Sequence, residues 1–201
     1  MIIDKAIQGT KEWREARGGI PTASAFDMII TTSGTPSKQK QKYLYSLAAE
    51  RITGVSEDKY QNDAMKRGIE MEAEARAMYE LVTGNTVEVV GVCYPDKKKL
   101  YGCSPDGLVG ADGVLEIKCP TAPIHVGYLF NGGLPTDYYC QVQGQLLVTG
   151  RKYVDFFSYF PGLAPLLVSV KPDEKFQKAL RVELEIFVKE LDEITERLKR
   201  I

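Results

Sequence analysis

Three charged residues of this 201-residue chain, Asp106, Glu116 and Lys118, lie in the segment S-P-D-G-L-V-G-A-D-G-V-L-E-I-K-C-P, residues 104–120. Residues 114–119 read as a short strand. Because side chains on a strand alternate between faces, Glu116 and Lys118 share one face of it. Charged groups buried without partners are costly, so this pair indicates a site. Two carboxylates beside a lysine are suited to holding a divalent metal and an activated water.

Asp106 must reach that strand from the preceding segment. It follows a proline and precedes a glycine, so we expect a turn that directs its carboxylate toward the strand. The other face of the strand carries Leu115, Ile117 and Cys119.

The elements around this strand predict one mixed α/β domain over residues 1–201. A helix capped by Thr10 opens the chain, and a meander of three strands contains the charged segment. The predicted helices cover residues 21–31, 42–53, 63–82, 136–149 and 173–199. The predicted strands cover residues 86–94, 100–104, 114–119, 153–160 and 166–170, and residues 121–135 are expected to be loop-rich.

Composition excludes several classes of protein. The net charge is −1, so any nucleic-acid binding must depend on locally concentrated basic residues or on geometry. No segment is apolar enough to cross a bilayer, and the protein should be intracellular. The four cysteines have no C-x-x-C spacing, which argues against disulfides and a zinc ribbon. His125 is the single histidine, so histidine catalysis is excluded by count, and a loop or structural role is expected for it.

Two lysine-bearing segments have two interpretations each. Lys38, Lys40 and Lys42 lie in a polar loop, and residues 97–99 form a lysine run at a predicted turn. Either segment could contact DNA, and either could be a solvated surface loop.

The Pro-Asp turn followed by Glu-x-Lys is typical of the PD-(D/E)xK nuclease superfamily. The resemblance extends to further blocks: W-R-E-A-R-G-G-I-P-T-A-S, A-E-R-I-T-G, R-G-I-E-M-E-A-E-A, S-P-D-G-L, L-E-I-K-C-P and Y-Y-C-Q-V-Q. Together, in this order, they resemble the lambda exonuclease or YqaJ-type viral recombinase family. The blocks run from about Trp13 to Thr149.

This resemblance implies a restriction-endonuclease-like PD-(D/E)xK core, with a mixed β-sheet flanked by helices. It implies a metal-dependent 5′→3′ exonuclease that degrades one strand of double-stranded DNA from its ends. It also implies a ring-shaped homotrimer that works with a phage single-strand annealing protein in homologous recombination. Such a protein would be encoded by a phage or prophage and act in the cytoplasm of the bacterial host.

The family's catalytic positions fall on the same charged residues. Asp106 and Glu116 would hold Mg²⁺, or Mn²⁺ in its place, and the Ile117 carbonyl could add a backbone ligand. Lys118 would position the attacking water or help to deprotonate it. Glu72 would complete the site for one or two ions.

Glu72 has competing explanations within its own helix. It lies four residues before Arg76, so a surface ion pair would also account for it. Glu70 and Glu74 are alternative candidates for the helix acid.

The resemblance places the terminal 5′-phosphate on four residues: Arg17, Ser24, Ser104 and Gln141. An arginine fork with hydroxyl and amide donors suits a phosphate dianion. Ser24 could instead cap a helix, and Arg17 could form a surface ion pair. Gln143 and Gln145 are less favoured than Gln141.

Two other interpretations remain from the sequence. One is a different PD-(D/E)xK nuclease, either an endonuclease or a Cas4-like enzyme. The Cas4-like case expects a cysteine cluster, yet no cysteine follows Cys140. The other is an inactive fold that only binds DNA, which would not need Asp106, Glu116 and Lys118 together.

Overall fold

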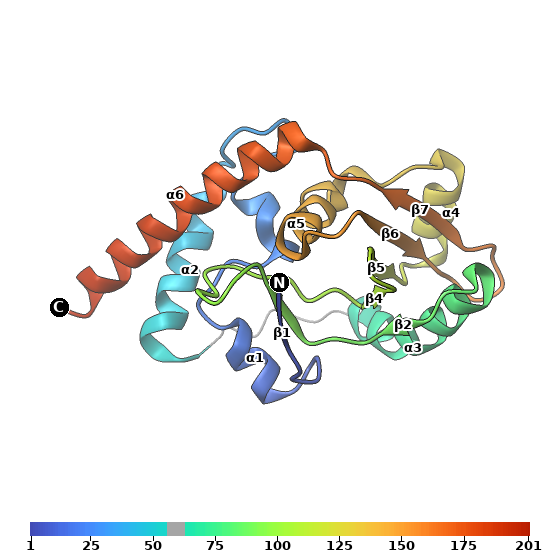
Figure 1. Ribbon diagram of the computed structural model, residues 1–201, viewed down its shortest axis with the longest axis horizontal. Helices are drawn as coiled ribbons and strands as arrows, with labels where there is room; N and C mark the ends of the chain where they lie inside the picture. The colour runs from blue at the N-terminus through green and yellow to red at the C-terminus, as the bar shows by residue number, and fades with distance from the viewer. Residues whose placement is uncertain (56–62) are drawn as a thin grey trace.

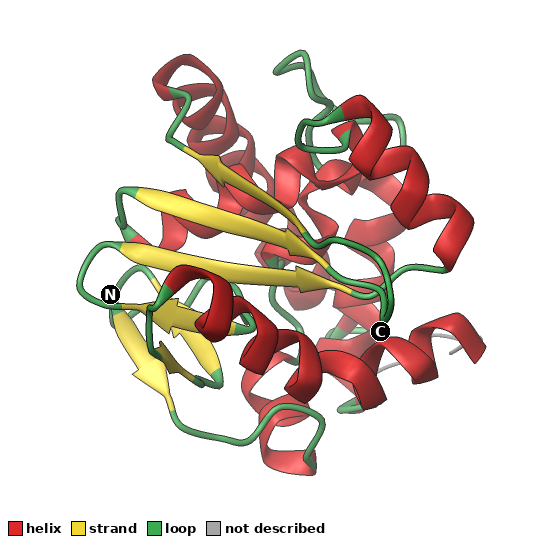
Figure 2. Cartoon of the chain, turned by 90° about the vertical axis from the view of Figure 1, so that its right-hand side faces the viewer, coloured by secondary structure: helices red, strands yellow, loops and turns green. Residues whose placement is uncertain are grey.

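The central feature of the computed structural model, which describes residues 1–55 and 63–201, is a five-stranded mixed β-sheet (Figures 1 and 2). Its strands, in spatial order, are β2 (Val87–Glu88), β4 (Gly107–Val109), β5 (Gly113–Lys118), β6 (Tyr153–Ser158) and β7 (Leu166–Val170). β5 and β6 are parallel, and the other neighbouring strands are antiparallel. A separate antiparallel pair joins β1 (Ile2–Asp4) to β3 (Val92–Tyr94).

Helices cover both faces of this sheet (Figure 2). α3 (Asp63–Thr83) packs on one face, whereas α5 (Tyr139–Thr149) packs on the other and is itself covered by α6 (Glu174–Leu198). The remaining helices are α1 (Lys11–Arg17), the 3-10 helix η1 (Ala23–Met28), α2 (Lys40–Thr53), α4 (Ala122–Asn131) and the 3-10 turn η2 (Thr136–Tyr138). No helix among the described residues is both long and apolar enough to span a membrane.

The alternation of side chains along β5 divides the core into two clusters. Val114 belongs to the larger cluster, with α5 and α6, whereas Leu115 and Ile117 belong to a smaller one with Ala75 and Tyr79 of α3. Period-two alternation therefore leaves Glu116 and Lys118 on the α5 face, as the sequence predicted.

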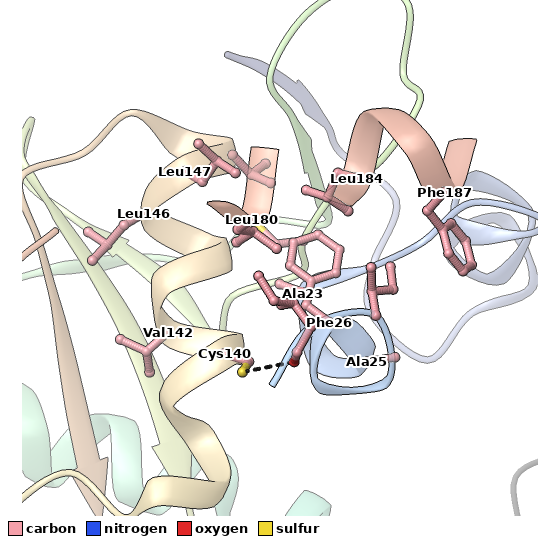
Figure 3. Packing of buried hydrophobic residues seen from close by; sticks show 14 of the residues in the cluster. Ala23, Ala25, Phe26, Cys140, Val142, Leu146, Leu147, Leu180, Leu184 and Phe187 are labelled. Carbon is pink, nitrogen blue, oxygen red and sulfur yellow. Dashed lines mark hydrogen bonds between the residues drawn. The ribbon is translucent and has the colours of Figure 1, made fainter. Parts of the chain in front are cut away.

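A close approach of α5 to η1 depends on Gly144. A Cβ atom at this position would lie 2.5 Å from the ring of Phe26. Figure 3 shows Phe26 packed beside α5, where the Cys140 thiol donates to the Ile30 carbonyl. The missing side chain thus lets the segment that carries Ser24 lie close to the glutamine-bearing helix.

The predicted turn at Pro105-Asp106-Gly107 is wrong. Residues 107–109 form β4, and the turn follows at residues 110–112, with Gly110 at φ 52°. Proline cannot donate to a strand ladder, and a glycine tolerates positive φ, so pairing begins after Pro105 and reverses at Gly110. The predicted strand over residues 100–104 reduces to two isolated bridges, from Cys103 to Cys93 and from Gly102 to Thr22.

Residues 121–135, expected to be loop-rich, contain α4 instead. Pro123 stands in the first turn of α4, where its missing N–H costs no helical hydrogen bond. Gly132 ends the helix at φ 69°. Both residues therefore mark the ends of a helix that was not predicted. The single strand predicted over residues 86–94 divides into β2 and β3, which lie in different sheets, and the helix predicted over residues 21–31 is the 3-10 helix η1. The remaining predicted helices and strands correspond to observed elements, with shifted ends.

Candidate active site

Asp106, directly before β4, lies opposite Glu116 of β5. Gly107 pairs with Leu115, which places Asp106 across from Glu116. The Asp106 backbone N–H donates to the Leu115 carbonyl at 3.1 Å, and its Oδ2 accepts from the Ile117 N–H at 2.5 Å. Sheet register thus brings the carboxylate of Asp106 to the strand that carries Glu116, although no turn directs it.

Lys118 is paired with Glu116. Its Nζ lies 2.5 Å from Glu116 Oε1, and the side chains of Lys118 and Glu116 are 26% and 3% exposed. The ammonium also lies over the ring of Tyr138, 5.0 Å from the ring centre. A lysine reachable from solvent therefore stands between the buried acid and the surface, where it could meet a phosphate.

The charges of these residues shift one another's pKa values. Burial, together with the charge of Glu116, raises the pKa of Asp106 well above its ordinary value. Burial alone would lower the pKa of Lys118, but the carboxylates of Glu116 and Asp106 raise it. The carboxylates of Asp106 and Glu116 thus repel each other in the metal-free protein, and Lys118 stays charged beside them.

Two glutamines of α5 donate to Glu116. Nε2 of Gln141 lies 2.5 Å from Oε1, and Nε2 of Gln145 lies 2.5 Å from Oε2. Residues four apart share a face of a helix, so both amides point at the same carboxylate. Gln143 points elsewhere, as expected: it binds the backbone at Lys171 and Asp173.

Glu72 approaches the site from α3. Its charge contributes to the raised pKa of Asp106, and the charges of Asp106 and Glu72 add to burial in raising the pKa of Cys119 to about 11. Glu72 is also paired with Arg76, as the simpler interpretation anticipated. Glu74 accepts a hydrogen bond from the Tyr159 hydroxyl and Glu70 is exposed, so Glu72 remains the best-placed helix acid.

Arg17 and the hydroxyl groups predicted to bind phosphate lie together. The Nη2 atom of Arg17 donates to the hydroxyl of Thr22 at 3.1 Å and to that of Ser24 at 3.3 Å. The Arg17 guanidinium stacks on the ring of Trp13. The Trp13 indole N–H donates to Ser104 Oγ at 3.1 Å. Trp13 therefore connects Arg17 to Ser104, two residues before Asp106.

Ser24 does not cap a helix. It lies inside η1, whose N-cap is Thr22. Burial lowers the pKa of Arg17, and the charge of Glu116 is among those that raise it. Arg17 is thus within electrostatic reach of Glu116.

The donor set at Asp106 and Glu116 fits a divalent cation. Both are hard oxygen donors, and their mutual repulsion is what a bound cation would relieve. Among residues 1–55 and 63–201, no group of three or more acid, histidine or cysteine side chains is arranged to hold a metal. Further ligands would therefore have to include backbone oxygen, water or substrate.

The sequence of residues 12–152 matches the family model for the YqaJ-like viral recombinase domain. The chain belongs to this family. Its fold is similar to that of an alkaline exonuclease from Laribacter hongkongensis, with a TM-score of 0.86 and 35% identity over 95% of this chain and 97% of that one. The same exonuclease in complex with dAMP is equally similar. No curated protein matches the sequence.

A phage-related exonuclease from Haemophilus somnus shares the fold at a TM-score of 0.65, with 12% identity over 89% of this chain and 96% of that chain. These similarities and the mixed sheet with helices on both faces confirm the predicted PD-(D/E)xK fold.

The histidine of this YqaJ-like chain is a structural residue, as expected. His125 is buried in α4, where Nδ1 lies 2.7 Å from Ser158 Oγ and Nε2 lies 2.9 Å from the Ala164 carbonyl oxygen. It ties α4 to β6 and to the loop after it.

In each of the two lysine-bearing segments, a lysine side chain contacts another part of the protein. Lys40 pairs with Glu183 and Glu190 of α6, and Lys99 lies over the ring of Tyr94. Lys97 and Lys98 are exposed at the turn.

Among the contributors to the site, Trp13 was missed from the sequence, and Gln145 was considered but less favoured than Gln141. Gln145 follows Gln141 by one helical turn, and this spacing could have placed both on one face. The bond from Trp13 to Ser104 joins residues 91 positions apart, and no local pattern contains it.

Proposed function

We propose that this protein is a DNA exonuclease that uses a divalent metal to hydrolyse one strand of linear duplex DNA in the 5′→3′ direction. The observation that supports this most is that Glu116, which lies across from Asp106, accepts hydrogen bonds from Lys118 and from the amide of Gln141, in a chain 35% identical to an alkaline exonuclease.

Each catalytic residue has a proposed role. Asp106, Glu116 and the Ile117 carbonyl would hold Mg²⁺, or Mn²⁺, and Glu72 would serve a second ion. When bound, the metal lowers the pKa of water and stabilises the charge that develops on the phosphate. Lys118, which its acidic neighbours keep charged, orients the attacking water and offsets phosphate charge. For Glu72 to bind a metal ion, its carboxylate must first leave the ion pair with Arg76.

The preference for a 5′-phosphorylated end is proposed to come from Arg17, Ser24, Ser104 and Gln141. The guanidinium already carries two hydroxyl partners and an aromatic support, so it is held in place before a phosphate arrives. Each cut creates a new 5′-phosphate, which this pocket would bind next.

The wider setting is also a proposal. A chain that folds as a single nuclease domain over residues 1–201 with a net charge of −1 has little bulk attraction to DNA. Enclosing the duplex in a homotrimeric ring would replace part of that attraction. A phage single-strand annealing protein would bind the exposed strand during recombination, in the cytoplasm of the bacterial host.

The test is digestion of a linear duplex with Mg²⁺, where one 5′ end is phosphorylated, the other bears a hydroxyl, and each strand is labelled at its 3′ end. We expect progressive loss of the phosphorylated strand from its 5′ end and no loss in EDTA. Internal cuts, or nicking of a closed circle, would indicate an endonuclease. No cleavage of any DNA would indicate a binding protein.

A further inference from the structure

Gln145 is a buried polar residue with no role in the steps above. Its side chain is 1% exposed, and its Nε2 donates to Oε2 of Glu116 at 2.5 Å. Its Oε1 atom is buried and has no hydrogen-bond partner among the described residues. The amide is therefore satisfied at one end only, the end that meets Glu116.

Gln143, two residues earlier in the same helix, provides a comparison. It is also 1% exposed, but both ends of its amide are bonded, at 2.9 Å to the Lys171 carbonyl and at 2.9 Å to the Asp173 N–H. Gln143 thus ties α5 to the segment between β7 and α6. Gln145 makes no such link, and a buried carbonyl without a donor favours neither folding nor packing.

What Gln145 contributes is visible at Glu116. Oε1 of Glu116 accepts from Lys118 and Gln141, whereas Oε2 accepts from Gln145. A carboxylate with donors on both oxygens cannot rotate without losing a charge-assisted hydrogen bond.

We propose that Gln145 is a positioning residue, which holds the Glu116 carboxylate in the orientation needed to bind a divalent cation. This inference rests on the proposed function, because it assigns Gln145 to the metal site of the exonuclease. Gln145 acts through Glu116, as partners of metal ligands commonly do.

The experiment compares Gln145→Met with the matched control Gln143→Met. Methionine keeps much of the length and volume of glutamine but removes both polar ends. The full chain is titrated with Mn²⁺ by calorimetry without DNA, its thermal unfolding is followed in EDTA, and nucleotide release is measured over a range of DNA concentrations.

For Gln145→Met we expect Mn²⁺ affinity to fall by about 10–100-fold, the usual loss for a partner of a metal ligand. The KM for DNA should stay within about twofold, because Gln145 lies behind Glu116, and turnover at limiting Mn²⁺ should fall. Unfolding temperature in EDTA should be unchanged or higher, since the unpartnered carbonyl is gone. Gln143→Met should do the reverse, with lower stability and unchanged Mn²⁺ affinity.

Gln145→Asn is a second variant in case the methionine is not accommodated. It keeps the amide but shortens its reach by one methylene, so the same loss of Mn²⁺ affinity is expected. Unchanged Mn²⁺ affinity in either folded variant overturns the inference about Gln145 but leaves the proposed function standing. The same conclusion follows if Gln145→Met loses as much stability as Gln143→Met while its Mn²⁺ affinity does not change. A wild-type chain that neither binds Mn²⁺ nor releases nucleotides overturns the proposed function, and this inference with it.

Discussion

Nε2 of Gln141 lies 2.5 Å from Oε1 of Glu116, so a residue of the proposed 5′-phosphate pocket is in direct contact with a proposed catalytic acid. An amide nitrogen carries two hydrogens and can donate to a second acceptor at the same time. Gln141 is therefore placed to join recognition of the DNA end to the geometry of Glu116.

The substitution Gln141→Leu should reduce both functions. We expect the preference for 5′-phosphorylated over 5′-hydroxyl ends to fall, and turnover on either end to fall by about tenfold, because a hydrogen bond to a charged group is lost. Digestion of both substrates, at saturating DNA, measures the two effects. A loss of preference with normal turnover would show that Gln141 serves the phosphate alone.

Lys118→Ala should reduce cleavage by about 100-fold or more while DNA binding changes little. The lysine is partly exposed at the end of β5, so its removal leaves the packed strand intact. Lys152→Ala is the control, since Lys152 forms an ion pair with Asp112 at the surface. Nucleotide release and gel-shift binding separate the two effects, and near-normal turnover of Lys118→Ala would remove this residue from the chemistry.

Asp106→Asn should stabilise the metal-free protein, more so at pH 8 than at pH 4. Burial and the charge of Glu116 raise the pKa of Asp106 in the folded state above that in the unfolded chain. Folding therefore loses stability as the pH rises from the ordinary aspartate value through the raised one, and asparagine removes that loss.

Thermal unfolding in EDTA at the two pH values measures this stabilisation. Adding Mg²⁺ should raise the unfolding temperature of the wild-type protein and not that of Asp106→Asn, whose activity should be lost. An equal rise in both proteins would mean that Asp106 does not hold the ion.

Arg17→Ala should slow digestion from 5′-phosphorylated ends by roughly 10–100-fold, the range for a hydrogen bond to a charged group. Digestion from 5′-hydroxyl ends should change much less. Arg14→Ala, an exposed arginine of the same helix, should leave both rates unchanged. Equal slowing on both kinds of end would assign Arg17 to general DNA binding or to folding.

Gly144→Ala should destabilise the protein by about 1–3 kcal/mol, the range for overpacking a core. The added Cβ would lie 2.5 Å from the ring of Phe26 and would push α5 away from η1. Gly127→Ala in α4 meets nothing within 4 Å and should instead stabilise by roughly 0.5–1 kcal/mol, as alanine favours helix. Urea unfolding measures both, and equal effects would contradict the close contact.

Local patterns were enough to predict which side chains lie on each face of β5. Period-two alternation assigned Glu116 and Lys118 to one face and Leu115 and Ile117 to the other, and the structure has them so. The cap of α1 at Thr10 and the C-terminal helix, expected over residues 173–199 and found as α6, were predicted in the same way. These features depend on residues within a few positions of one another, where backbone geometry alone decides which side chains meet.

The composition of the site was decided by tertiary structure. Asp106 reaches Glu116 through strand register, and Trp13 reaches Ser104 across 91 positions. Gln145 meets Glu116 only because α5 packs on that face of β5. Such contacts depend on how separate elements pack, and a glycine such as Gly144 can set that distance. The sequence by itself therefore determined which residues could do chemistry, whereas packing and register decided which of them act together.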